Sequence, residues 1–262
     1  MKGVVLILIS VISITAQAQQ DISALLQTTK GVISTEVAAS KIESFVSTVQ
    51  KSNLSDKDRL HKVFKKINSV FLKKYVAYSD FDELFTSGKY DCLTATAIYS
   101  LVLDRLHYAY EIIETNYHIF LVVQTSEGEV LIETTDRFGG FICGAGAIAS
   151  RLGSYRENVL ATNTANQYLR YSFKLYQPIS AANLNGLLYF NQAVKAFNKH
   201  MLLESAVLLE KSNLNYSSPR CEELGMLLAH SVMQSTLDQQ TKAACLSYLN
   251  HIIVRKEVAG LD

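Results

Sequence analysis

The chain has 262 residues, nearly equal numbers of acidic and basic side chains, and a formal net charge of +1. Because 48% of the residues are apolar, the chain can bury a large core and lacks the composition of a disordered protein. Its charges are also interspersed, without the basic surface that nucleic-acid binding requires. We therefore expect a folded protein that does not bind nucleic acid.

The N-terminus has the pattern of a secretory signal peptide. Lys2 precedes an apolar run from Val4 to Thr15, which is shorter than the roughly 20 residues of a transmembrane helix. Ala16 and Ala18 place small residues where signal peptidase cleaves. We predict that residues 1–18 are a signal peptide, removed near Ala18, and that the protein is exported to the periplasm or the exterior. An uncleaved membrane anchor is the alternative that the short run disfavours.

Export would permit a disulfide among three of the four cysteines, Cys143, Cys221 and Cys245. The favoured pair is Cys221 and Cys245, because both fall in the helical C-terminal part. The alternative is that all three are small buried hydrophobic side chains. The sequence leaves both interpretations open.

The first part of the chain reads as helix. Apolar spacing predicts an amphipathic helix from Ala38 and a second helix from Asp58 to Tyr75. Ser55 or Asp56 is a suitable N-cap for the second helix. Residues 78–89 are predicted to form a loop or a short helical turn.

The centre of the chain switches from helix to strands. A helix is predicted from Cys92 to Leu106, followed by three strands and a hairpin turn at residues 126–128. The predicted strands are Ala109–Glu114, His118–Thr125 and Glu129–Thr134. The glycine-rich residues 137–153 are predicted to be an ordered loop with a short helix, and residues 168–176 a last strand. A helix followed by consecutive antiparallel strands is an α+β arrangement.

After Pro178 the pattern becomes continuously helical. Four helices are predicted, over Leu187–Met201, Leu203–Leu214, Pro219–Gln234 and Gln239–Val254. The spacing of Ala193, Ala206 and Pro219 resembles a degenerate tetratricopeptide repeat, although any antiparallel helical hairpin uses similar residues. We therefore expect an α+β domain over residues 19–177 and a helical region over residues 178–262.

Three residues in the central stretch have the chain order of an acyl-transfer site. Cys92 opens a predicted helix, where the positive end of the helix dipole lowers the pKa of a thiol. His118 opens an apolar strand, and Glu133 closes the next strand, where it is able to orient the imidazole. Counting around the predicted turn places Asp136 opposite His118, so Asp136 is the alternative acid. For a cysteine taken alone, a buried structural role is the better interpretation.

These residues stand in motifs that resemble the transglutaminase-like superfamily of papain-like cysteine enzymes. The motifs are YDCLTATAIYSLVLDRLHY with Cys92, YHIFLVV with His118 and LIETT with Glu133. The resemblance covers roughly residues 60–135 and departs from many relatives at His107 and Phe120. It implies a helix bearing Cys92 packed on a small antiparallel sheet, with a helical or tetratricopeptide-like extension as in some bacterial members.

The resemblance implies a hydrolase that attacks amide bonds of a peptide or protein through Cys92, with His118 as base and Glu133 as orienting acid. The signal-peptide pattern adds that this enzyme is exported. Hydrolysis is favoured over cross-linking, and no cofactor is expected. No pair of histidines stands at metal-ligand spacing, so no metal site is expected either. The alternative is an inactive binding or scaffold protein of the same fold whose C-terminal helices hold a protein partner.

Overall fold

A five-stranded antiparallel sheet organises the first of the two units into which the chain divides. In the computed structural model, which describes residues 22–29, 31–50, 53–116, 118–161 and 175–253, the boundary between the units falls between Ala181 and Ala182. The first unit combines this sheet with helices and the second is helical, which confirms the predicted α+β class. The predicted signal peptide lies outside the described residues.

The strands of the sheet are ordered β6-β5-β4-β3-β7. Their bounds are Tyr110–Thr115 for β3, Ile119–Thr125 for β4, Gly128–Ile132 for β5, Phe141–Cys143 for β6 and Tyr176–Ile179 for β7. Thr125 pairs with Gly128, so the turn between β4 and β5 contains only Ser126 and Glu127. Two-residue hairpin loops match the natural twist of paired strands.

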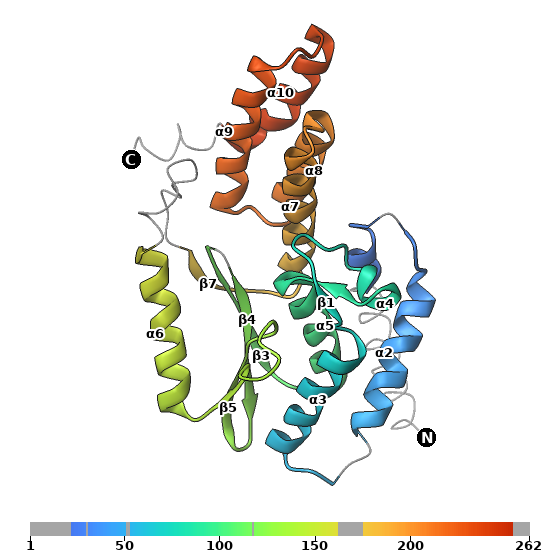
Figure 1. Ribbon diagram of the computed structural model, residues 1–262, viewed down its shortest axis with the longest axis vertical. Helices are drawn as coiled ribbons and strands as arrows, with labels where there is room; N and C mark the ends of the chain where they lie inside the picture. Colours follow the sequence, from blue (N-terminus) through green and yellow to red (C-terminus); the bar gives the residue numbers. More distant parts are fainter. Residues whose placement is uncertain (1–21, 30, 51–52, 117, 162–174, 254–262) are drawn as a thin grey trace, which may run out of the picture. The chain divides into compact units, whose positions relative to one another are not determined.

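Helices cover both faces of this sheet. In Figure 1, α6 lies along one face, while α5 and α3 lie beyond the other. The helices of this unit are α2 (Thr35–Gln50), α3 (Asp56–Val70), α4 (Glu83–Thr86), α5 (Cys92–Arg105) and α6 (Ala145–Ala161). Successive strand residues point to opposite faces, so Phe120 and Val122 pack with Ile148 of α6 while Ile119 and Leu121 face the other side. Both faces of β4 are therefore buried, as its unbroken apolar run requires.

The prediction for residues 137–153 was incomplete. This segment begins as a loop that ends at Gly140, but it also contains the strand β6 and the first nine residues of the 17-residue helix α6. Gly146 and Gly153 suggested a loop, yet both lie within α6, where no atom outside the helix lies close to them. Packing of Ile148 and Leu152 against the sheet outweighs the low helix propensity of glycine.

Two short strands were not predicted. Lys74–Tyr75 (β1) and Lys89–Tyr90 (β2) pair in parallel beside the start of α5. The predicted last strand at residues 168–176 lies mostly outside the described residues, and β7 begins at Tyr176. Two-residue strands have too little periodicity to be recognised in a sequence.

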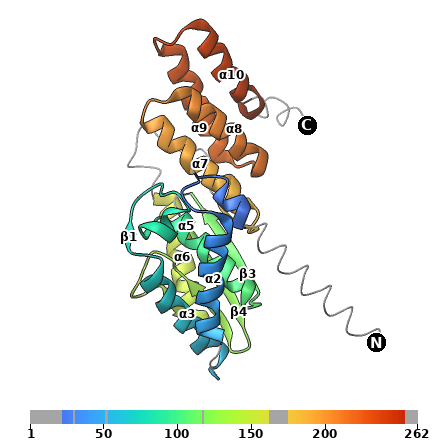
Figure 2. The same cartoon turned by 90° about the vertical axis from the view of Figure 1, so that its right-hand side faces the viewer.

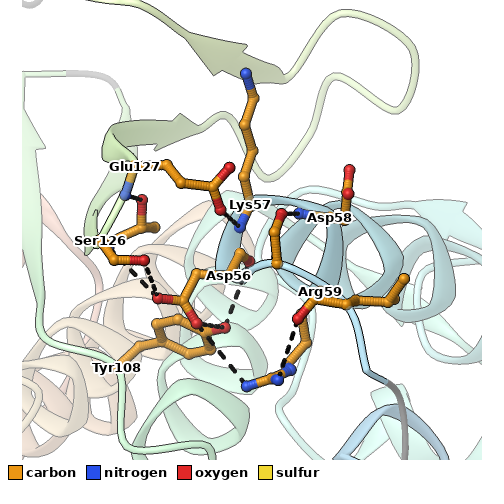
Figure 3. A network of polar contacts seen from close by, with 10 residues as sticks. Asp56, Lys57, Asp58, Arg59, Tyr108, Ser126 and Glu127 are labelled. Carbon is orange, nitrogen blue, oxygen red and sulfur yellow. Dashed lines mark hydrogen bonds and ion pairs between the residues drawn. The ribbon is translucent and has the colours of Figure 1, made fainter.

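The start of α3 is bonded to the tip of the β4–β5 hairpin (Figure 3). Asp56 accepts a hydrogen bond of 2.7 Å from the Ser126 hydroxyl and one of 3.3 Å from the Tyr108 hydroxyl. The backbone N–H of Lys57 donates to Glu127 at 3.1 Å. The network joins the two-residue turn to a helix that precedes it by 70 residues.

This network predicts a specific acid sensitivity. The Ser126 hydroxyl, followed by its backbone N–H, lowers the pKa of Asp56. A lowered folded-state pKa contributes stability above the unfolded value of about 3.9, and this stability is lost as the pH falls through the folded value. Between pH 7 and pH 3 we expect the free energy of unfolding of wild type to fall by up to about 1 kcal/mol more than that of Ser126→Ala. The difference is small because Asp56 is partly exposed. Urea unfolding of both proteins at each pH measures the difference, and equal losses would contradict it.

In its described residues the second unit is built of the consecutive helices α7 to α10, which Figure 2 labels. They are α7 (Asn183–Asn198), α8 (Leu202–Asn215), α9 (Pro219–Gln234) and α10 (Gln239–Ile253). Ala193 and Ala206 are fully buried where α7 meets α8, and the Ser205 hydroxyl donates to the Ala193 carbonyl at 2.9 Å. Small residues at a close helix crossing fit both a tetratricopeptide-like pair and an ordinary helical hairpin.

None of the four cysteines forms a disulfide. Cys221 and Cys245 lie in the core of the second unit, and the Sγ atom of Cys221 is 3.4 Å from the Ser212 hydroxyl. Cys143 is partly buried in β6. The interpretation of Cys221 and Cys245 as small buried hydrophobic side chains therefore describes the structure, and the disulfide between them does not.

Candidate active site

Cys92 is the first residue of α5, and the helix start is fixed by a reciprocal cap. The Asp91 carboxylate accepts from the Thr94 backbone N–H at 2.8 Å, and the Asp91 N–H donates to the Thr94 hydroxyl at 2.9 Å. Both capping residues are buried, whereas Cys92 is partly exposed. A capping box holds the first turn of a helix in one conformation. The thiol is therefore carried on a rigid, partly accessible helix terminus.

His118 and Glu133 meet at the open end of the β4–β5 hairpin. His118 immediately precedes β4 and Glu133 immediately follows β5. The pairing of Leu121 with Ile132 continues to a position where Phe120 is opposite Glu133, so His118 and Glu133 share one face. His118 Nε2 is hydrogen-bonded to Glu133 Oε1. The Glu133 side chain is buried and that of His118 is partly exposed.

Asp136, the alternative acid, does not reach His118. Its Oδ1 accepts from the backbone N–H groups of Phe138 at 3.2 Å and Gly139 at 2.8 Å. The prediction that favoured Asp136 counted residues outward from a three-residue turn. The observed turn has two residues, so the strand register moves by one residue and Asp136 is no longer opposite His118. Asp136 consequently closes its own loop, and Glu133 is the carboxylate that contacts the imidazole.

Thr134 connects this hairpin to the start of α5. It is adjacent to Glu133, and its fully buried side chain donates to the Cys92 carbonyl at 3.4 Å. The first residue of α5 is thus tied to the residue that follows Glu133. The structure brings the backbone of Cys92 to the same end of the sheet as the His118–Glu133 pair.

Tyr155 of α6 is a member of the site that the sequence did not indicate. Its hydroxyl donates to Glu133 Oε2, and its ring stacks on Phe120 with centroids 4.9 Å apart. The ring centroids of Tyr155 and His118 are 5.9 Å apart. Burial and then the Glu133 carboxylate raise the pKa of Tyr155 far above its usual range, so the hydroxyl remains protonated. The helical spacing of Ile148, Leu152 and Tyr155 was the signal available for α6.

Two tyrosines of the short β1–β2 pair lie near the start of α5. Tyr75 of β1 and Tyr90 of β2 are paired in register, and their rings meet edge to face with centroids 5.7 Å apart. Partial burial and then the charge of the Cys92 thiolate raise the pKa of Tyr75 to about 12. Cys92 therefore has an aromatic neighbour, about half exposed, which is able to contact a bound peptide.

The described part of the chain was compared with the requirements of a metal site and of a membrane-spanning helix. No three histidine, cysteine, aspartate or glutamate side chains of these residues come together as a metal site. None of the helices that the structure describes has the length and apolar character needed to cross a bilayer.

Comparison of the chain with protein-family models, with curated proteins and with solved structures found no match in any of the three.

Proposed function

We propose that this protein is an exported cysteine-nucleophile hydrolase of amide bonds, with a core of the papain and transglutaminase type. The observation that supports it is the hydrogen-bonded array of His118, Glu133 and Tyr155, tied through Thr134 to a cysteine at a capped helix start. The three motifs in the sequence and their chain order support the same reaction class. The substrate is a peptide or protein, and no cofactor takes part.

The hydrogen bonds give each nitrogen of His118 a role. Since the Tyr155 hydroxyl is a protonated donor, Glu133 Oε2 accepts its hydrogen. Oε1 then accepts a hydrogen from His118 Nε2. In the neutral imidazole Nδ1 therefore carries the lone pair, and it is the nitrogen that takes the proton of the Cys92 thiol.

The proposed reaction proceeds through a thioester. The Cys92 thiolate attacks the amide carbonyl, a C–S bond forms, and the backbone N–H at the start of α5 donates to the oxyanion. The His118 imidazolium gives its proton to the amine as the C–N bond breaks. Water then loses a proton to His118 and attacks the thioester, which releases the acid and restores the thiol.

Alkylation of Cys92 by iodoacetamide tests the proposal without a known substrate. A thiolate paired with His118 reacts well below pH 8, whereas an unperturbed thiol, with a pKa of about 8.5, is under about 1% ionised at pH 6. We expect rapid modification of wild type at pH 6, read by peptide mass spectrometry, and a fall to the slow rate of an ordinary thiol in His118→Ala. Cys143, partly buried on β6, is an internal control in each digest.

Two results would count against an enzyme. The first is slow wild-type modification at pH 6, and the second is a rate that His118→Ala leaves unchanged. Either would favour the alternative of an inactive scaffold of this fold, with a protein partner on the C-terminal helices.

A further inference from the structure

We infer that Tyr155 is a positioning residue for the Glu133–His118 pair, which makes α6 a structural part of the site. This inference rests on the proposed function, because it assigns Tyr155 a role in the reactivity of Cys92. The transglutaminase-like motifs in the sequence contain only a helix and two strands. In this chain a third element, on the α6 face of the sheet, completes the array.

The contacts of Glu133 show what Tyr155 contributes. The carboxylate is buried, with His118 Nε2 and the Thr135 hydroxyl (3.4 Å) at Oε1 and the Tyr155 hydroxyl at Oε2. Donors at both oxygens prevent the carboxylate from rotating about its last bond, and Tyr155 is the donor at Oε2. Oε1 is then held toward the imidazole, which fixes the hydrogen on Nε2.

Tyr155 is itself held from two sides. Its ring stacks on Phe120 at an interplanar angle of 24°, within the cluster that includes Ile148 and Leu152. Its hydroxyl therefore reaches Glu133 from a fixed ring. Removal of the hydroxyl alone leaves the ring and its packing in place, so it tests the polar contacts of the hydroxyl, which are the hydrogen bond to Glu133 and the one with the Arg151 side chain.

The charged groups around the array are few among the described residues. Arg151, one turn before Tyr155 on α6, lowers the pKa of Tyr155 against the larger effects of burial and Glu133. His118 lies at the start of β4, and the Cys92 thiol lies at the start of α5. Asp136 is directed into its own turn. Glu133 is thus the carboxylate that the imidazole contacts, and Tyr155 and Thr135 are its other donors.

Tyr155→Phe, made in the otherwise unchanged protein, tests the inference. Loss of a hydrogen bond to a charged group weakens the thiolate–imidazolium pair, so the acidic limb of the Cys92 alkylation profile moves to higher pH and the rate at pH 6 falls about tenfold. In ¹⁵N spectra of His118, recorded in a Cys92→Ala background at a pH where the imidazole is neutral, we expect one dominant Nε2–H tautomer when Tyr155 is present and a mixture in Tyr155→Phe. Neither readout follows from a role in packing alone.

Tyr110→Phe is the matched control. The Tyr110 hydroxyl also donates to a carboxylate, Asp104 at 2.9 Å, but away from the site on the exposed end of β3. We expect this variant to keep the wild-type alkylation profile and tautomer. An equal loss of reactivity in both variants would overturn the inference, because it would show a general effect of losing a tyrosine hydroxyl.

The outcomes separate this inference from the function it rests on. If wild-type Cys92 reacts as an ordinary thiol, the proposed function fails, and the tautomer measurement still decides whether Tyr155 orients the pair. If Cys92 is reactive and depends on His118, but Tyr155→Phe changes neither rate nor tautomer, the positioning role is wrong and the proposed function stands.

Discussion

Replacing Gly140 by alanine is expected to destabilise the first unit by about 3 kcal/mol and to abolish the reactivity of Cys92 at pH 6. A Cβ atom at Gly140 would lie 2.3 Å from the carbonyl oxygens of both Glu133 and Asp136. The same glycine accepts from the Glu133 N–H at 2.8 Å and donates to the Asp136 carbonyl at 2.9 Å. The new methyl group therefore pushes apart the backbone segments that position Glu133. The atoms it meets belong to the backbone, so no side-chain rotation relieves the clash.

Gly146→Ala is the control for this substitution. Gly146 lies in the first turn of α6 with no neighbouring atom in reach of a Cβ, so alanine there is expected to be neutral or to stabilise by up to about 1 kcal/mol. Urea unfolding followed by circular dichroism measures both variants, and iodoacetamide labelling reads the site. Wild-type stability in Gly140→Ala would show that the loop from Glu133 to Gly140 adapts freely.

Glu133→Gln is expected to lower the alkylation rate of Cys92 at pH 6 by about a hundredfold. The wild-type carboxylate accepts from His118 at one oxygen and from Tyr155 at the other. Glutamine has one acceptor oxygen, and its NH₂ group faces a second donor, so one of the two bonds is lost. Breaking a buried charge pair costs about 3 kcal/mol, which corresponds to about two orders of magnitude.

Asp136→Asn provides the matched change of a carboxylate to an amide. The Asp136 side chain accepts from two backbone N–H groups through Oδ1, and the oxygen of asparagine is able to accept both. We expect its labelling profile to match wild type. The reverse result, with Asp136→Asn inactive and Glu133→Gln unaffected, would make Asp136 the acid that orients His118.

Most of the secondary structure that carries the candidate site could be predicted from the sequence because its signals are local. The helix from Cys92 and the strands on either side of Ser126 have clear periodicity, and the observed bounds differ from those predicted by at most two residues. The choice between Glu133 and Asp136 depended on a single residue in the length of a turn. Periodicity does not determine that length, whereas the family motif favoured Glu133.

Tyr155 could not be predicted for a different reason. Its hydrogen bond to Glu133 joins residues 22 positions apart through a helix that packs on the far face of the sheet from α5. The glycines at 144, 146 and 153 also masked the apolar spacing of α6. The face of the sheet that a helix covers is decided by tertiary packing. Neither helix propensity nor a motif made of two strands predicts it.

If the protein acts on a peptide as proposed, the outer strands of the sheet limit how that peptide is held. β6 has three residues, and β7 has four residues including Pro178, which has no N–H to donate. Peptides that bind by extending a sheet need a longer edge with a continuous row of backbone donors and acceptors. A substrate of this protein would therefore depend on side-chain contacts near Cys92, such as those that Tyr75 and Tyr90 offer, and its recognition would be selective for side chains rather than for extended backbone.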